Sequence, residues 1–271
     1  MRNDFAPRPA VVEEVVVETP TIRTLVLRPS EPVPFRAGQF VQLCVPGVGE
    51  APFTPSSSPS EPGRLEVTVL RAGRVTAALH ALAAGDEIGV RGPFGRGYPL
   101  PRMEGREVVV VGGGVGLAPL RSLLYALFER PGFARRVSIR YGARSPGELC
   151  FRRQYADWAA RPGVDFTPTI DRPAEGWGGR VGLVTTLLDG MGVDVKEACA
   201  LSCGPEIMLK FVARKLVDVG FPPEHVFLSM NRNMSCGIGI CGRCNVGSTY
   251  LCKDGPDLSY AEVRHVPYAL G

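Results

Sequence analysis

Four of the eight cysteines crowd into one short, glycine-rich segment near the C-terminus. Their spacing is C-x4-C-x2-C-x7-C, and the residues are Cys236, Cys241, Cys244 and Cys252. Thiolates so close together, in a long chain with no apparent secretory leader, favour a metal site over a disulfide framework. The glycines between them allow strained backbone around an inorganic core and let amide N–H groups point at negatively charged sulfurs.

Two kinds of metal centre suit these ligands. The first three cysteines reproduce the C-x4-C-x2-C loop that wraps a 2Fe-2S cluster in plant-type ferredoxins. A structural zinc ion held by four thiolates is the alternative. Zinc ribbons usually pair two short C-x2-C knuckles, whereas this segment has only one, so the spacing favours the iron–sulfur cluster.

A glycine-rich turn is the second chemical feature. An apolar strand at residues 107–111 runs directly into GGGVGLAP, and an amphipathic helix follows. Such a turn brings backbone amides and a positive helix end to a pyrophosphate. The candidate residues are Gly112, Gly113, Gly114, Gly116 and Pro119. The spacing is not G-x-G-x-x-G, so a purely structural tight turn is the alternative.

A later apolar strand ends at Cys203, Gly204 and Pro205. The carboxyl ends of parallel strands meet at one edge of a sheet, so these residues are expected to face the same crevice as the glycine turn. The alternative for Cys203 is a small buried core thiol, the commoner fate of an isolated cysteine.

Two segments in the first hundred residues offer further contacts for a ring or an anion. The polar run at 52–60 contains Phe53 and Thr54 and supplies hydroxyl and amide donors. The run VLRAGRVT places an arginine and a helix start beside a glycine, which makes a candidate anion site. Its candidate residues are Val69, Leu70, Arg71, Gly73, Val75 and Thr76. A plain surface loop and a capped surface helix with a solvated arginine are the alternatives.

Secondary-structure elements that position these residues can be predicted from the periodicity of the chain. Short alternating runs at 11–19, 21–29, 40–46, 64–72 and 87–93 predict an antiparallel β-barrel or sandwich, interrupted by a helix at 76–82 that begins at Thr76 as its capping residue. From residue 107 the pattern becomes α/β. Further strands are expected at 137–143 and 198–204, and helices at 117–130, 148–160, 182–191 and 206–220.

Length and composition agree with more than one domain. The chain has 271 residues, of which 45% are hydrophobic and 21% charged, so it can bury real cores and is not disordered. A net charge of +4 is too small to indicate nucleic acid or a membrane surface as a partner. No apolar stretch is long enough to span a membrane, and we expect a cytoplasmic protein. The expected domains are a barrel at 1–103, an α/β domain at 104–229 and a metal-binding lobe at 230–271.

Together these segments resemble the ferredoxin–NADP reductase superfamily, in which a flavin-binding barrel precedes a nicotinamide-nucleotide domain. More narrowly, the chain is similar to the gamma subunits of cytosolic NiFe hydrogenases and sulfhydrogenases. The flavin subunit of anaerobic sulfite reductase and the electron-transfer subunit of dihydroorotate dehydrogenase are near relatives. Besides the cysteine loop, the motifs that carry the likeness are GQF at 38–40, PFT at 52–54, GRVTAAL at 73–79, RGPFG at 91–95, GGGVGLAPL at 112–120 and CGPEIM at 203–208.

The resemblance implies particular cofactor contacts. Phe53 and Thr54 stand where the family's R-x-Y-S motif has its Tyr and Ser beside the flavin ring. Ala51 occupies the arginine position, which leaves Arg71, Val75 and Thr76 to hold more of the diphosphate and keeps FMN as an alternative to FAD. The resemblance places the nicotinamide at Cys203, Gly204 and Pro205, with Cys203 as the catalytic residue beside the reacting carbon. Arg144 matches the adenosine-ribose region, where a cation would suit NADPH as well as NADH.

The resemblance also implies an electron-transfer subunit. NAD(P)H delivers electrons in pairs and a 2Fe-2S cluster accepts them singly, so a flavin is needed between them. The expected partners are other subunits of a redox complex, with a hydrogenase or sulfur reductase first, a sulfite reductase second and a dihydroorotate dehydrogenase third. A stand-alone NAD(P)H:ferredoxin reductase is an alternative, and a non-enzymatic zinc-binding module is another.

Overall fold

The structure, a computed structural model, describes residues 5–270 and divides the chain into two units. The first unit holds the described residues up to Tyr98, together with Arg121–Ala126 and Asn231–Pro256. The second unit holds Pro99–Leu120, Leu127–Met230 and the described residues from Asp257 onward. The segment with the four clustered cysteines therefore belongs to the same unit as the N-terminal strands, whereas the residues that follow it belong to the second unit.

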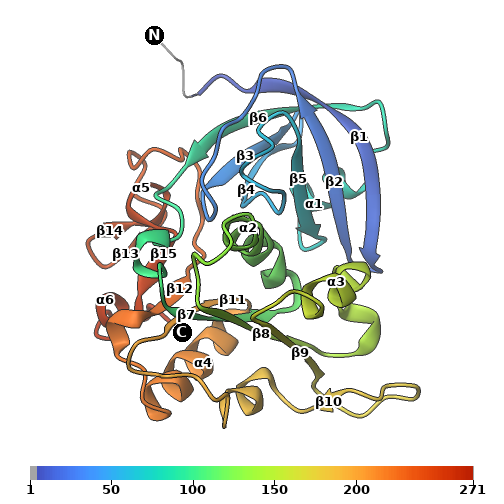
Figure 1. Ribbon diagram of the computed structural model, residues 1–271. Helices are drawn as coiled ribbons and strands as arrows, with labels where there is room; N and C mark the ends of the chain where they lie inside the picture. Colours follow the sequence, from blue (N-terminus) through green and yellow to red (C-terminus); the bar gives the residue numbers. More distant parts are fainter. Residues whose placement is uncertain (1–4, 271) are drawn as a thin grey trace. The chain divides into compact units, whose positions relative to one another are not determined.

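A six-stranded antiparallel sheet with a barrel-like fold dominates the first unit (Figure 1). Its strands are β1 (Arg8–Thr19), β2 (Ile22–Pro29), β3 (Phe40–Val45), β4 (Gly49–Phe53), β5 (Leu65–Leu70) and β6 (Glu87–Phe94), in the order β4-β3-β6-β1-β2-β5. Branched and aliphatic side chains of these strands, among them Val12, Leu25, Leu43, Val67 and Val90, share one buried core. All five predicted strands are confirmed, and β4 is an additional one.

The short helix of this unit, α1 (Arg74–His80), begins two residues earlier than predicted. Gly73 is the capping residue, and Thr76 lies within the first turn. The Oγ1 atom of Thr76 accepts hydrogen bonds from the amides of Ala72 and Gly73, each at 2.8 Å. Thr76 therefore stabilises the helix start from inside the helix, as the third residue of a capping box does.

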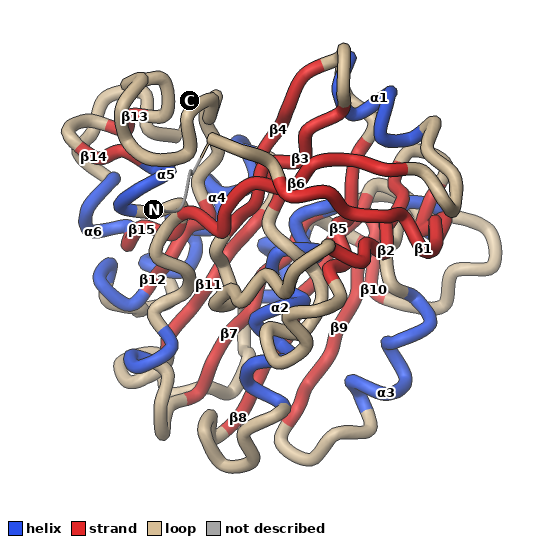
Figure 2. The backbone as a smooth tube through the Cα atoms, turned by 90° about the horizontal axis from the view of Figure 1, so that it is seen from above, coloured by secondary structure: helices blue, strands red, loops and turns tan. Residues whose placement is uncertain are grey.

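A seven-stranded sheet forms the second unit, and Figure 2 shows its strands side by side. The strands are β7 (Glu107–Gly113), β8 (Arg136–Ala143), β9 (Val164–Ile170), β10 (Arg180–Val181), β11 (Cys199–Cys203), β12 (Val226–Ser229) and β15 (Asp257–Ser259), in the order β10-β9-β8-β7-β11-β12-β15. All pairs are parallel except β12 with β15, which is antiparallel. The four valines of β7 are fully buried, as expected for a central strand of a parallel sheet.

Two of the four helices predicted for the α/β region are confirmed as α2 (Leu117–Phe128) and α4 (Glu206–Asp218). The prediction for 148–160 is wrong over its first half, because the only α-helical residues in this range are those of α3 (Tyr155–Ala159) in its second half. Phe151 takes a left-handed φ of 57°, a conformation that an α-helix cannot continue, while its side chain is fully buried. The prediction for 182–191 is also wrong, because only residues 184–188 form a 3₁₀ helix, a short connector that buries Val184 and Leu188.

The C-terminal segment contains only short elements. They are β13 (Asn245–Val246), β14 (Thr249–Tyr250), α5 (Leu251–Asp254) and α6 (Tyr260–Val263). Ser259 and Glu262 form a capping box at the start of α6, where the Ser259 amide donates to the Glu262 carboxylate at 2.8 Å. Among the described residues, no helix has the length and apolar character needed to cross a bilayer.

Candidate functional site

The predicted glycine turn and the predicted Cys203 segment meet in the second unit. β7 and β11 are parallel neighbours, and Gly112 pairs with Cys203 in their register. After β7 the chain makes a single 3₁₀ turn at Gly114–Gly116 and enters α2. A Cβ atom on Gly116 would lie 2.2 Å from the carbonyl oxygen of Cys203, so only glycine allows this contact. The start of α2 thus lies beside the carboxyl end of β11.

Other members of the predicted set surround this contact. Gly113 and Gly204 both lie under the Met208 side chain, and Pro205 directly precedes α4. Tyr141, which sequence reasoning missed, fixes the turn by donating its hydroxyl to the Gly114 carbonyl at 3.0 Å. Burial raises the pKa of Tyr141 well above its ordinary value, so the hydroxyl stays protonated and remains a donor. This hydrogen bond therefore fixes the Gly114 carbonyl at the start of the turn.

Cys203 has two polar neighbours that the sequence did not reveal. The register of β12 with β15 places Ser229 opposite Asp257, and the Ser229 hydroxyl donates to Oδ1 of Asp257. The other oxygen, Oδ2, is buried and accepts no hydrogen bond among the described residues. Burial, and then the charge of Asp257, raise the pKa of the Cys203 thiol to about 12. Cys203 is therefore a neutral thiol at the edge of the sheet rather than a thiolate nucleophile.

The buried carboxyl predicts a pH dependence of stability. Burial raises the pKa of Asp257 to about 7, so the folded chain holds this proton more tightly than the unfolded chain. The resulting stabilisation is complete below about pH 4 and is lost as the pH rises to about 7. We expect Asp257→Asn to remove this loss, so that the variant melts at a higher temperature than the parent protein above about pH 7.

Thermal unfolding of the parent protein and of Asp257→Asn in the same buffers measures this effect. Titrations elsewhere in the chain change both melting temperatures equally, so they cancel when one is subtracted from the other. Melting curves that stay parallel across the pH range would contradict the assignment of this titration to Asp257.

In the first unit, the predicted flavin contacts lie around α1 and its neighbouring strands. Phe53 ends β4, Thr54 follows it, and both Phe53 and Val75 pack against the barrel core. Leu70 and Arg71 are exposed at the end of β5, whereas the Val69 side chain is fully buried. Val69 could therefore reach a ligand only through its backbone, and its carbonyl already lies 2.8 Å from Nε2 of His80.

The serines of the polar run at 52–60 have partners within the protein. Ser56 shares a hydrogen bond of 3.0 Å with Thr68, and the Glu66 amide donates to the Ser57 hydroxyl at 3.1 Å. Arg121 forms a buried ion pair with Glu66. Burial opposes the ionisation of Glu66, but Arg121 and then Arg64 outweigh it and lower the pKa of that carboxyl. Ser56 and Ser57 therefore stabilise the polar run by internal hydrogen bonds. Phe53 and Thr54 remain as its candidates for contact with a ligand.

The four cysteines of the predicted metal site form two pairs. The Sγ atoms of Cys244 and Cys252 are 3.3 Å apart and buried. The side chains of Cys236 and Cys241 also interact, and the Cys241 amide donates to Sγ of Cys236 at 3.5 Å. In the described part of the chain no three ligand-type side chains converge on one metal-sized point. Two pairs fit a binuclear cluster, in which each iron takes two protein ligands.

The electrostatics of the loop also suit a metal cluster. Burial opposes ionisation of Cys236, but the amides of Cys241, Ile238 and Ile240 donate to its sulfur and lower the pKa of the thiol to about 6. Burial and then the Cys244 thiol raise the pKa of Cys252 to about 12. Cationic iron between two such sulfurs would remove their repulsion and displace their protons. The residues present therefore fit the group that the spacing predicts.

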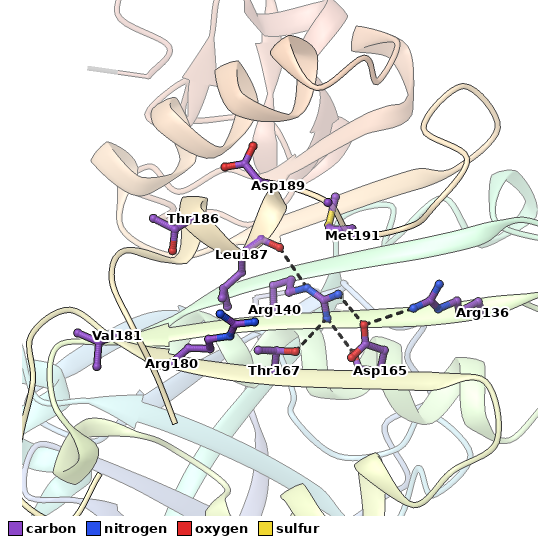
Figure 3. Close-up of a pocket in the computed structure, with 11 residues that line it drawn as sticks. Arg136, Arg140, Asp165, Thr167, Arg180, Val181, Thr186, Leu187, Asp189 and Met191 are labelled. Carbon is purple, nitrogen blue, oxygen red and sulfur yellow. Dashed lines mark hydrogen bonds and ion pairs between the residues drawn. The ribbon is translucent and has the colours of Figure 1, made fainter. Parts of the chain in front are cut away.

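Arg144 is exposed and directly follows β8, at the same edge of the sheet as the glycine turn. A separate cavity of about 620 Å³ in this unit is lined by none of the predicted nucleotide residues (Figure 3). Within it, Arg140 donates to the Asp165 carboxylate at 2.6 Å, to the Asp165 carbonyl at 3.1 Å and to the Leu187 carbonyl at 3.3 Å. Arg140 thus ties β8 to β9 and to the 3₁₀ connector.

Comparisons with known proteins match this architecture region by region. Residues 10–98 match the oxidoreductase FAD-binding domain, and residues 110–214 match the oxidoreductase NAD-binding domain. Residues 231–264 match the iron–sulfur cluster binding domain of dihydroorotate dehydrogenase B. Sulfhydrogenase 1 subunit gamma of Pyrococcus furiosus is 37% identical over 241 residues, which cover 86% of this chain and 82% of the relative.

The chain belongs to the ferredoxin–NADP reductase superfamily. A second relative is the probable dihydroorotate dehydrogenase B (NAD(+)) electron transfer subunit of Methanocaldococcus jannaschii, 35% identical over 252 residues, with 90% of this chain and 86% of the relative covered. Among solved structures, a chain of the NADH-dependent reduced ferredoxin–NADP oxidoreductase superposes with a TM-score of 0.78 at 27% identity, covering 94% of this chain and 89% of that one. The predicted superfamily and fold class are thereby confirmed.

Proposed function

We propose that this chain is the electron-transfer subunit of an oxidoreductase complex, passing electrons between NAD(P)H and a partner redox subunit. The observation that carries the proposal is the union, in one chain, of FAD-binding, NAD-binding and iron–sulfur-binding regions. A bound flavin supplies the conversion between electron pairs and single electrons.

Under this proposal, different residues would bind the flavin, the nucleotide and the cluster. Phe53, Thr54 and the start of α1 would hold the flavin, with Arg71 near its phosphates. The turn at Gly114–Gly116 would present amides to the nucleotide pyrophosphate, while Cys203, as a neutral thiol, would border the nicotinamide. Two pairs of thiolates, Cys236 with Cys241 and Cys244 with Cys252, would ligate a 2Fe-2S cluster. The chain's contribution to hydride transfer is orientation, because no side-chain acid or base is required.

A hydrogenase or sulfur reductase is the partner we favour, since sulfhydrogenase gamma subunits are 37% and 36% identical to this chain. The same domain order would also serve a dihydroorotate dehydrogenase, whose electron-transfer subunits reach 36% identity, or a sulfite reductase. Purification of the native complex, with identification of the chains that accompany this one, separates these cases. Full turnover with soluble ferredoxin and no stable complex would indicate a stand-alone reductase instead.

The absence of disulfides among the described residues suits the reducing cytoplasm, where we place the protein.

The central test uses the chain purified without oxygen. We expect flavin absorbance bands with iron–sulfur shoulders, and bleaching of both when NADH or NADPH is added. The reduced protein should show the EPR signal of a 2Fe-2S cluster. A colourless protein that holds stoichiometric zinc would overturn the proposal.

Nucleotide choice depends on Arg144. If this exposed guanidinium contacts a 2′-phosphate, Arg144→Ala should raise the KM for NADPH by about tenfold and leave the KM for NADH nearly unchanged. Steady-state kinetics with both nucleotides measures the difference, and Arg28→Ala, at an exposed arginine of the barrel, is the matched control. Equal effects on the two nucleotides would remove Arg144 from this role.

A further inference from the structure

The backbone that enters the cysteine loop is held by two side chains of the barrel-like sheet. Nε2 of Gln42 donates to the Met234 carbonyl at 2.9 Å. Arg91 donates from Nη2 to the Ser235 carbonyl at 3.2 Å and from Nη1 to the Cys236 carbonyl at 3.3 Å. Gln42 and Arg91 are partners in the register of β3 and β6. Three successive carbonyls, ending at the first cysteine, are therefore fixed from adjacent strands.

Glu50 on β4 holds Arg91 in this position. Its carboxylate accepts from Nε of Arg91 at 2.9 Å and from Nη2 at 2.6 Å, which is a two-point contact. The Arg91 side chain is 3% exposed and that of Glu50 is 34% exposed. A guanidinium so deeply buried is tolerated because it has both an anionic partner and carbonyl acceptors. Nη1 and Nη2 of the same guanidinium donate to the loop carbonyls, so the cation of the pair lies against the backbone of the first cysteine.

The next residue along the loop also rests on β6. Gly237 has a φ of 82°, and a Cβ atom there would lie 2.9 Å from the Phe94 ring. The same ring lies 5.5 Å from the Arg91 guanidinium. Arg91 therefore holds the Cys236 carbonyl, and the Phe94 ring lies against the next residue, Gly237.

We propose that the Arg91–Glu50 pair positions the first cluster ligand and sets the reduction potential of the cluster. This inference rests on the proposed function, because it requires that Cys236 ligate iron. A cluster bound by four thiolates gains negative charge when it is reduced, and a nearby buried cation stabilises that reduced state. The Glu50 carboxylate, which contacts Nε and Nη2 of Arg91, opposes this effect, so the potential reflects the balance of the two charges.

A purely mechanical clamp would not need this charge pair. Gln42 already holds the neighbouring Met234 carbonyl with a neutral amide, at no cost in desolvated charge. Arg91, the partner of Gln42 on the neighbouring strand, is ion-paired with Glu50 and adds an electric field that a neutral amide lacks. The two roles make different predictions for the two charge-removing variants.

The test is an EPR-monitored redox titration of the cluster-loaded full chain. Arg91→Gln should lower the midpoint potential, because it removes the cation and leaves the Glu50 carboxylate. Glu50→Gln should raise the potential, because it leaves the cation uncompensated. At a fixed solution potential, Arg91→Gln and Glu50→Gln should each change the ratio of reduced to oxidised cluster by about tenfold, in opposite directions. Arg91→Lys should stay near the parent potential, since it retains the charge.

Hydrogen exchange of residues 234–244 in the same samples reads the positioning role separately. Arg91→Lys should exchange faster there, because a lysine cannot reproduce the fork of donors. The exposed pair of Arg28 and Glu13, changed to Gln in the same way, is the matched control and should move neither readout. Midpoint shifts of the same sign in Arg91→Gln and Glu50→Gln, or no shift in either, would overturn the proposal. Failure of the parent chain to hold any cluster would instead overturn the proposed function.

Discussion

Replacing Gly116 by alanine is expected to reduce the rate of NAD(P)H-driven flavin reduction by about 100-fold. The added Cβ would lie 2.2 Å from the Cys203 carbonyl oxygen and 2.7 Å from the Gly204 Cα. Both obstacles are backbone atoms, so the turn and the end of β11 must move apart. That movement separates the amides expected to bind the pyrophosphate from the residues expected to border the nicotinamide. Stopped-flow measurement of flavin bleaching gives the rate.

Two further variants distinguish displacement of the turn from general damage. Gly178→Ala adds a Cβ that meets nothing within 4 Å and should leave the rate unchanged. Gly114 has a φ of 55° with open space around it, so alanine there costs only about 1–2 kcal/mol of backbone strain. Its effect on the rate should be smaller than that of Gly116→Ala. The reverse order would show that the contact with Cys203 does not matter for nucleotide binding.

The second large effect is expected at the cysteine loop. Cys241→Ser should abolish the EPR signal of the reduced cluster, because a serine hydroxyl at neutral pH is a poor replacement for a soft thiolate ligand. Flavin content should be unchanged, since Cys241 is exposed and takes no part in the barrel core. NAD(P)H should still bleach the flavin, while electron delivery to a one-electron acceptor falls to background.

Cys199→Ser is the control for this variant. Cys199 lies in β11, where its thiol donates to the Arg102 carbonyl at 3.0 Å, and a serine hydroxyl can replace that donor. The control should keep the full EPR signal. An undiminished signal in Cys241→Ser would remove this residue from the ligand set.

The features that were predictable from the sequence are those encoded within a few neighbouring residues. The strand of four valines, the glycine turn and α2 follow one another without a break, so both the βα unit and its turn could be recognised. The cysteine spacing is likewise local. α4 was predictable because its apolar residues Leu209, Val212, Ala213 and Leu216 recur at helical spacing on one buried face.

What escaped prediction depends on contacts between distant segments. Arg91 appears in the sequence only as part of RGPFG, and nothing local indicates that it binds carbonyls 144 and 145 positions further along the chain. Asp257 follows a glycine and a proline in the sequence, and nothing local indicates that β15 pairs it with Ser229 of β12 and that its Oδ2 atom is buried. The helix expected at 148–160 failed at Phe151, which is buried and has a left-handed backbone that helix propensity cannot anticipate.

β12 and β15 give the iron-binding segment a simple topology. Ser229 and Asp257 are paired in register, so the intervening residues form a loop whose two ends are already joined by neighbouring strands. Pairing of these strands by itself closes the loop, so most of the entropy of loop closure is lost in forming the sheet. Loss of the cluster would leave the segment attached to paired strands at both ends. A change in the length of the segment would therefore not by itself alter the pairing of β12 with β15.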